Sequence, residues 1–214
     1  MRTRALIFDM DGTLTDSIPT HVEAYRRVLE KNGLPPDTGF IASRFGMVSW
    51  EIWEAFAAHY KLDLDPKELA RQKFDLFLEL ADNITLLPGV IRVLDHADYM
   101  GWKTAIATGA NRDNMETALR TTGIRDRFDF LLPGDEAPRG KAHPDIWLAV
   151  ARALRVDPSD CTVFEDGVPG LLSARDAKMR TVAVASGFLT REELATTAPD
   201  LLIDSLDDLD LKWL

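Results

Sequence analysis

Two aspartates separated by one residue follow the first apolar run of the chain. Residues 5–8 (Ala-Leu-Ile-Phe) lead into Asp9, Asp11 and Gly12, a pattern typical of a short strand buried on both faces of a parallel sheet. Residues i and i+2 of an extended segment point to the same side, so both carboxylates can face one crevice. Unit charges about 4 Å apart repel by roughly 4 kcal/mol at an effective dielectric near 20. A cation is therefore expected between or beside them.

The same Asp-x-Asp spacing occurs at residues 63–65 and 208–210, without a preceding apolar run or a following glycine. Because Asp favours helix caps and turns, both copies are interpreted as solvated caps or loops. Only the first copy couples a buried strand to a glycine that lets the chain leave the sheet sharply. The alternative for Asp9 and Asp11 is a strand end that carries two exposed acids.

A second apolar run, residues 104–107, ends in Thr108, Gly109, Ala110 and Asn111. The threonine hydroxyl and the backbone amides that follow it, placed before a helix, are suited to binding phosphate oxygens. A threonine and a glycine after a strand are also a common turn, so this pattern alone leaves both interpretations open.

A third run, residues 161–164, ends in Glu165 and Asp166. The carboxyl ends of parallel strands open on one edge of a sheet, where such sheets bind ligands, so the three clusters can meet there. Carboxylate oxygens are the ligands that Mg²⁺ prefers. An acid pair after an apolar run can also be an ordinary helix start.

Helical periodicity covers residues 18–32, about 40–60 and 66–80, and no strand pattern occurs between about 15 and 85. Helices with apolar faces must pack on one another, so this stretch is predicted to be a compact helical insertion. After it, apolar runs alternate with helical patterns, and the expected strands are 104–107, 128–131, 161–164, 181–184 and 201–203.

Repeated strand–helix units predict an α/β fold with a Rossmann-like, doubly wound parallel sheet. The core domain is expected to comprise residues 1–14 and 86–214. A small all-helical cap domain, residues 15–85, would be inserted after the first strand.

The composition, with 214 residues, 46% hydrophobic and 28% charged, is that of a soluble globular protein. A net charge of −10 argues against nucleic acid or an anionic membrane as partner. One cysteine, Cys161, excludes an internal disulfide. Only four apolar residues precede Asp9, which predicts neither a signal peptide nor a spanning helix. A cytoplasmic monomer that binds a small phosphate ester is expected.

Residues 9–17 (Asp-Met-Asp-Gly-Thr-Leu-Thr-Asp-Ser) resemble the first motif of the haloacid dehalogenase-like superfamily of phosphotransferases. The resemblance implies that Asp9 is the nucleophile and Asp11 the general acid and base. The simple dehalogenases of that superfamily lack the second acid. Asp11 therefore favours phosphoryl transfer, because an alkoxide leaving group needs a proton and a halide does not.

The other motifs of the superfamily are matched with two departures. Thr108 stands where the second motif has Ser or Thr, and Lys141 resembles the lysine of the third motif. The third motif usually has Pro where this chain has Ala142, and the fourth commonly has Ser where it has Gly167. The lysine charge is retained, so its assignment is expected to stand.

The acid pair resembles the fourth motif, whose acids help to hold magnesium. The resemblance implies that Asp9, the backbone carbonyl of Asp11 and Asp166 bind Mg²⁺. Glu165 would bind it directly or through water.

The motif order and residues 16–21 resemble the β-phosphoglucomutase and sugar-phosphatase branch of this superfamily. Residues 46–52 and 62–66 look like the caps of bacterial fructose-1-phosphate phosphatases. Mutases of the branch carry a cap arginine that grips a second phosphate, and this chain has Ser49 and Trp50 near that position.

The expected function is therefore a Mg²⁺-dependent sugar phosphatase that works through an aspartyl phosphate. His21, Arg44 and Trp50 are expected to contact the substrate from the cap. A phosphosugar mutase and a catalytically silent module that binds phosphate ligands are the alternatives.

Overall fold

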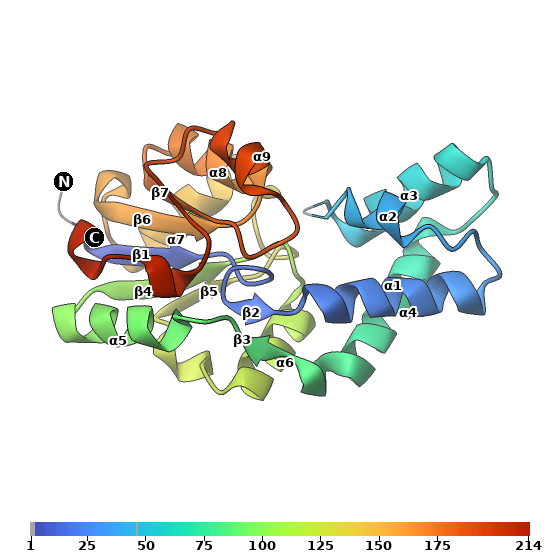
Figure 1. Ribbon diagram of the computed structural model, residues 1–214, viewed down its shortest axis with the longest axis horizontal. Coiled ribbons are helices and arrows are strands. Elements are labelled where there is room, and N and C mark those ends of the chain that lie inside the picture. The colour runs from blue at the N-terminus through green and yellow to red at the C-terminus, as the bar shows by residue number, and fades with distance from the viewer. Residues whose placement is uncertain (1–2, 46) are drawn as a thin grey trace.

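The computed structural model describes residues 3–45 and 47–214 (Figure 1). Its main sheet has six strands, all paired in parallel, in the order β5-β4-β1-β6-β7-β8. The predicted first strand lies inside the sheet between β4 and β6. The strands are β1 (Ala5–Phe8), β4 (Lys103–Ala107), β5 (Phe130–Leu132), β6 (Cys161–Glu165), β7 (Arg180–Val184) and β8 (Leu201–Ile203).

Alternate residues of β1 pack against helices on opposite faces of the sheet. Leu6 and Phe8 share an apolar cluster with residues of α5 (Val90–Met100) and α6 (Arg112–Thr122). Ala5 and Ile7 share another with residues of α7 (Asp145–Leu154) and α8 (Val168–Asp176). Both faces of the strand are therefore buried, as its unbroken apolar run predicts. The predicted doubly wound α/β fold is confirmed.

Four helices at the other end of the molecule have an apolar cluster of their own (Figure 1). They are α1 (Ile18–Lys31), α2 (Thr38–Ala42), α3 (Ser49–Tyr60) and α4 (Pro66–Leu80). Two short strands, β2 (Thr15–Asp16) and β3 (Thr85–Leu86), pair antiparallel where the chain enters and leaves this helical part. That pairing lies at the predicted boundaries, while the division into core and cap domains stays a prediction.

Two predictions of local structure are wrong. The periodicity over about 40–60 forms two helices, because Val48 is extended and its N–H is capped by the carboxylate of Glu51, at 3.3 Å, which starts α3 anew. Gly46, in the stretch that resembles known caps, lies outside the described residues, as do Met1 and Arg2. The region from 15 to 85 does contain strand structure, in β2 and β3, which are too short to give an alternating pattern.

Short helices complete the chain and were not predicted. They are α9 (Arg191–Ala195) and the 3₁₀ turns η1 (Ala81–Asn83), η2 (Arg125–Arg127), η3 (Pro158–Asp160), η4 (Leu206–Asp208) and η5 (Leu211–Trp213).

The two other Asp-x-Asp copies are caps, as predicted. Asp65 accepts hydrogen bonds from the amides of Lys67 and Glu68 at the start of α4, and Asp210 accepts one from Lys212.

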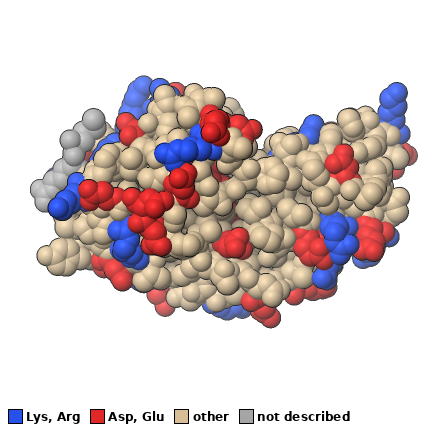
Figure 2. All heavy atoms as spheres, in the orientation of Figure 1, with Lys and Arg blue, Asp and Glu red and all other residues tan. Residues whose placement is uncertain are grey.

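Acidic and basic groups are interspersed on the face shown in Figure 2, which is notched between the sheet and the helical part. Among the described residues, none of the helices has the length and apolar character needed to cross a membrane.

Candidate active site

The acids at the carboxyl ends of β1 and β6 meet at one edge of the sheet. The amide of Asp9 donates to the carbonyl of Phe164 at 2.9 Å, which continues the pairing of the two strands up to the acids. Each of Asp9, Glu165 and Asp166 offers a carboxylate oxygen, and these oxygens all lie within 4.8 Å of one another. The acid at the end of β1 and the two at the end of β6 therefore lie together, whereas the meeting of these acids with the Thr108 loop stays a prediction.

Two glycines make room for the side chain of Asp166. Gly12 has a φ of +84°, which favours glycine, and a Cβ atom there would overlap with the Asp166 carboxylate. Gly187, in the loop after β7, lies so close that its Cβ would also overlap with that carboxylate. Thr13 donates a long hydrogen bond, 3.4 Å, to Asp166 Oδ1. Asp166 is thus enclosed by the turn after β1 and the loop after β7.

Glu165 and Asp9 share one lysine. The Nζ atom of Lys141 donates to Asp9 Oδ1 and, at 2.8 Å, to Glu165 Oε2. Burial lowers the pKa of Lys141, but the negative charges of Asp9 and Glu165 outweigh it and hold that pKa above its usual range. Lys141 is therefore a buried cation that offsets the charges of Asp9 and Glu165, whereas the sequence predicts a cation beside Asp9 and Asp11.

A hydrogen-bonded serine and tryptophan fix the backbone of this lysine. The hydroxyl of Ser173, on α8, donates to the carbonyl of Lys141 and accepts a 2.7 Å hydrogen bond from Nε1 of Trp147, on α7. The Lys141 Nζ atom lies 5.5 Å from the Trp147 ring centroid, within cation–π range. Side chains of α7 and α8 thus hold Lys141, the lysine that the resemblance to the third motif predicts.

Asp11 does not join the other acids but faces α1. Its Oδ1 accepts a 2.5 Å hydrogen bond from Ser17 and lies 3.3 Å from Nε2 of His21. Burial raises the pKa of Asp11, but the charge that His21 carries when protonated, hydrogen bonds from His21 and Ser17, and the charge of Lys73 outweigh this, so that pKa lies below its usual value. The predicted cap contact His21 is therefore a neighbour of the predicted acid–base residue.

His21 is in turn held by Lys73, a residue of α4. Lys73 Nζ lies 2.6 Å from His21 Nδ1, and the imidazole stacks on the ring of Phe77 at 4.4 Å between centroids. Burial lowers the pKa of His21 and brings that of Lys73 down to about 8. With a neutral imidazole, Lys73 donates to Nδ1 and the Nε2–H group donates to Asp11.

The loop after β4 leads directly into α6, as predicted, but one of its backbone amides, that of Ala110, already donates a hydrogen bond within the loop. Thr108 is buried, and its hydroxyl oxygen accepts the amide of Ala110 at 3.0 Å, which leaves the hydroxyl hydrogen free to donate. Asn111 is the N-cap of α6 and accepts the amide of Asn114. The space beside Gly109, where a Cβ would point, is open.

The other two predicted cap contacts are not brought to the acids by any contact among the described residues. Arg44 donates to the carbonyl of Phe40 and to Ser43, both within its own segment, and its guanidinium lies 3.5 Å from the Phe40 ring centroid. Trp50 is 40% exposed in the first turn of α3. Their contact with a substrate stays a prediction.

The acid cluster fits a hard divalent cation. Burial raises the pKa of Asp166 well above its usual value, and the charges of Asp9 and Glu165 raise it further. Against three carboxylates, Lys141 supplies one positive charge, so the cluster retains a net charge of about −2 when the acids are ionised. An all-oxygen donor set with excess negative charge is what Mg²⁺ and similar ions bind.

Two residues around this site, Lys73 and Gly187, are not predicted from the sequence, and Ser17 is predicted only as part of the first motif, without a contact of its own. Lys73 had a usable signal, because it lies four residues after Leu69 and four before Phe77 on the apolar face of α4. Charged residues are rarely buried without a partner, so a lysine at that place indicates a specific acceptor. Gly187 carried no comparable signal.

Comparisons with known proteins agree with this geometry. The model of the haloacid dehalogenase-like hydrolase family matches residues 3–178. The chain therefore belongs to the haloacid dehalogenase-like hydrolases, as the motifs predicted.

The proteins similar to this chain include phosphatases and mutases that act on small phosphorylated molecules. Fructose-1-phosphate phosphatase of Escherichia coli is 37% identical over 86% of this chain and 97% of that protein. CbbY of Rhodobacter sphaeroides, solved with xylulose-1,5-bisphosphate, has 28% identity and a TM-score of 0.86, covering 97% of this chain and 96% of that one. β-Phosphoglucomutase of Clostridium difficile has 27% identity and a TM-score of 0.86, covering 99% and 95%. The chain is a phosphatase of this family.

Proposed function

We propose that the protein is a Mg²⁺-dependent phosphatase that hydrolyses a small sugar phosphate through an aspartyl phosphate on Asp9. The observation that carries this proposal is the shared contact of Lys141 with Asp9 and Glu165, beside Asp166. This contact supports the proposal because the carboxylate of Asp9, a buried cation and two further carboxylates lie together at the ends of β1 and β6.

Asp9, Asp166 and the backbone carbonyl of Asp11 would hold Mg²⁺, with Glu165 binding directly or through water. When bound, the ion neutralises phosphate charge and draws electron density from phosphorus. Lys141 adds a second positive group in contact with Asp9. A phosphate dianion can therefore approach the carboxylates of Asp9 and Asp166.

The chain's own residues account for each proton and bond. An Asp9 oxygen attacks phosphorus, forming the P–O bond to the enzyme while the ester P–O bond breaks. Asp11 gives a proton to the departing alkoxide. It then takes one from the water that attacks the aspartyl phosphate, which releases phosphate and restores Asp9. The Thr108 hydroxyl donates to a phosphate oxygen.

Both of the donors described for Asp11, Ser17 and His21, bind Oδ1, which leaves Oδ2 for the proton in transit. Their effect lowers the pKa of Asp11 and favours its role as a base. Its role as an acid requires a higher pKa, and the negative charge of a bound phosphate raises it. The same carboxyl can therefore serve both half-reactions.

The alternative function, a phosphosugar mutase, needs a cation in the cap for a second phosphate. The sequence has Ser49 and Trp50 near the place of the mutase arginine, and the predicted cap contact Arg44 has its described contacts with Phe40 and Ser43. Lys73 is buried against His21. Both observations favour hydrolysis over the retention of a bisphosphate.

A panel of sugar monophosphates, assayed for inorganic phosphate with and without Mg²⁺, tests the proposal. Release that depends on Mg²⁺ and is abolished in Asp9→Asn is expected. Activity that survives this substitution would overturn the mechanism. Conversion of glucose 1-phosphate to glucose 6-phosphate with a bisphosphate activator would instead identify a mutase, and phosphate binding without turnover a silent module.

A further inference from the structure

The segment that follows β7 packs against Asp166 of the acid cluster. Ser186 donates a 2.8 Å hydrogen bond to the carbonyl of Gly12, in the turn after β1. The Cα atom of Gly187 lies 3.1 Å from where a Cβ of Gly12 would be, and Gly187 itself abuts the carboxylate of Asp166. A movement of residues 186–187 must therefore move Asp166 or leave a gap beside it.

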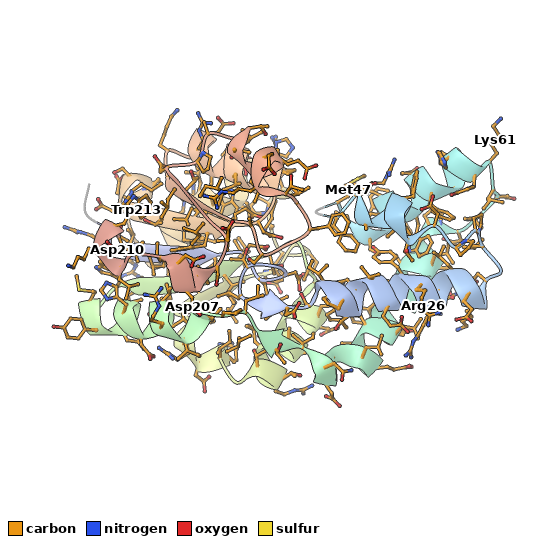
Figure 3. All side chains as sticks on the ribbon, in the orientation of Figure 1. Arg26, Met47, Lys61, Asp207, Asp210 and Trp213 are labelled. Atoms are coloured by element: carbon orange, nitrogen blue, oxygen red, sulfur yellow. The ribbon has the colours of Figure 1, made fainter. Side chains whose placement is uncertain are left out.

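The next residue, Phe188, reaches the helical part of the molecule. Its ring packs edge to face on Phe45, with centroids 5.6 Å apart, although the side chain remains 44% exposed. Phe45 lies in the segment between α2 and α3. Figure 3 shows Met47, two residues further on, at the edge of the helical part nearest the sheet.

Phe45 also belongs to the aromatic group around the residue that contacts Asp11. Its ring centroid is 6.3 Å from that of His21 and 5.9 Å from that of Tyr25. An unbroken series of contacts thus runs from Asp166 through Gly187 and Phe188 to Phe45 and His21.

We propose that Phe188 is a positioning residue. By packing on Phe45 it holds residues 186–187 against Asp166, so the affinity of the acid cluster for a divalent ion depends on the position of the helical part. The coupling rests on the proposed function, because it takes Asp166 as a ligand of the ion. It requires that a change in the helical part, at Phe45, alters ion affinity at Asp166 without touching any acid of the cluster.

The test measures binding of Mn²⁺ alone, by electron paramagnetic resonance, to wild type, Phe188→Ala, Phe45→Ala and the double variant. About tenfold weaker binding is expected in each single variant, the low end of what loss of an outer-shell partner costs a metal site. The double variant should bind no more weakly than the single variants, because both remove one shared contact. Phe188→Tyr, which keeps the ring, should bind as wild type does.

Ile91→Ala is the matched control, because Ile91 is 43% exposed, close to the exposure of Phe188, and lies on α5. Far-UV circular dichroism checks that each variant is folded, and Phe45→Leu replaces Phe45→Ala if the latter is not. Unchanged Mn²⁺ affinity in Phe45→Ala or Phe45→Leu, whatever Phe188→Ala does, would overturn the coupling alone. A wild type that neither binds Mn²⁺ nor hydrolyses phosphate esters would overturn the proposed function and the coupling with it.

Discussion

Lys73 Nζ lies 2.6 Å from Nδ1 of His21, so a lysine from α4, in the helical part, fixes the imidazole that contacts Asp11. Lys73 is 5% exposed and comes from α4, whereas Asp11 lies in the turn after β1, the central strand that ends at Phe8. The proposed acid–base residue is therefore held by a chain of contacts that crosses from the sheet into the helical part.

Replacing His21 by Ala is expected to slow turnover about tenfold to a hundredfold, less than the ~10²–10⁴ that a general acid–base group itself contributes. His21 lowers the pKa of Asp11, so its removal leaves the effect of burial less opposed, and that pKa rises. Where hydrolysis of the aspartyl phosphate limits kcat, Asp11 acts as the base, so the acidic limb of the kcat profile should then move to higher pH. His21→Asn, which can still donate to Asp11, should restore part of the shift, and an unmoved profile in His21→Ala would contradict the role.

Lys73 should also make stability depend on pH. Burial lowers its pKa from 10.5 to about 8, so above pH 8 the folded chain releases a proton that the unfolded chain keeps up to about pH 10.5. The penalty for burying the charge is full below pH 8 and is relieved as pH rises through this window. At ~1.4 kcal/mol for each pKa unit, the full effect is about 3 kcal/mol.

Urea unfolding of wild type and Lys73→Met at about pH 7 and about pH 9.5 measures this effect. Wild type should gain stability relative to Lys73→Met at the higher pH. Lys67→Met is the matched control, because Lys67 is exposed on the same helix, and its difference from wild type should not change with pH. A constant difference between wild type and Lys73→Met would show that the buried amine does not titrate in this window.

The sheet and the strand-end acids could be predicted because both depend on local pattern. Four apolar residues ended by Asp9 predict a buried strand, and parallel topology then brings its end to those of β4 and β6. Lys141 could be predicted only through its resemblance to the lysine of a known motif, because one lysine among 25 basic residues carries no local signal of its own.

The remaining features depend on contacts between distant residues, which periodicity does not contain. Gly187 matters because it touches Asp166, a residue in another loop, and Phe45 because it meets Phe188 across two parts of the fold. The break between α2 and α3 was missed because the two helices continue one apolar periodicity, although Glu51 caps Val48.

Gly187→Ala should weaken divalent-ion binding by about tenfold to a hundredfold, because the added methyl group displaces Asp166. A Cβ atom at this position would lie 2.9 Å from the Cβ of Asp166, too close for rotation of the carboxylate alone to relieve. Mn²⁺ titration measures the loss. Gly39→Ala in α2 is the control, since its Cβ would meet no atom closer than 3.4 Å. Equal affinity in both variants would show that the loop after β7 yields instead of Asp166.

The two fully buried tryptophans Trp53 and Trp147 should respond differently to the same substitution. Nε1 of Trp147 donates to Ser173 at 2.7 Å, whereas Nε1 of Trp53 is buried and has no acceptor among the described residues. Trp→Phe removes a similar apolar area at both sites. At Trp147 it also breaks a hydrogen bond worth ~0.5–1.5 kcal/mol, whereas at Trp53 it removes an unsatisfied donor whose burial costs ~1–3 kcal/mol.

The free energy of unfolding in urea should therefore fall more in Trp147→Phe than in Trp53→Phe, by about 1 kcal/mol or more. Each variant serves as the control for the other, because both side chains are fully buried and the mutation is identical. A larger loss in Trp53→Phe would mean that the Trp53 indole N–H finds an acceptor.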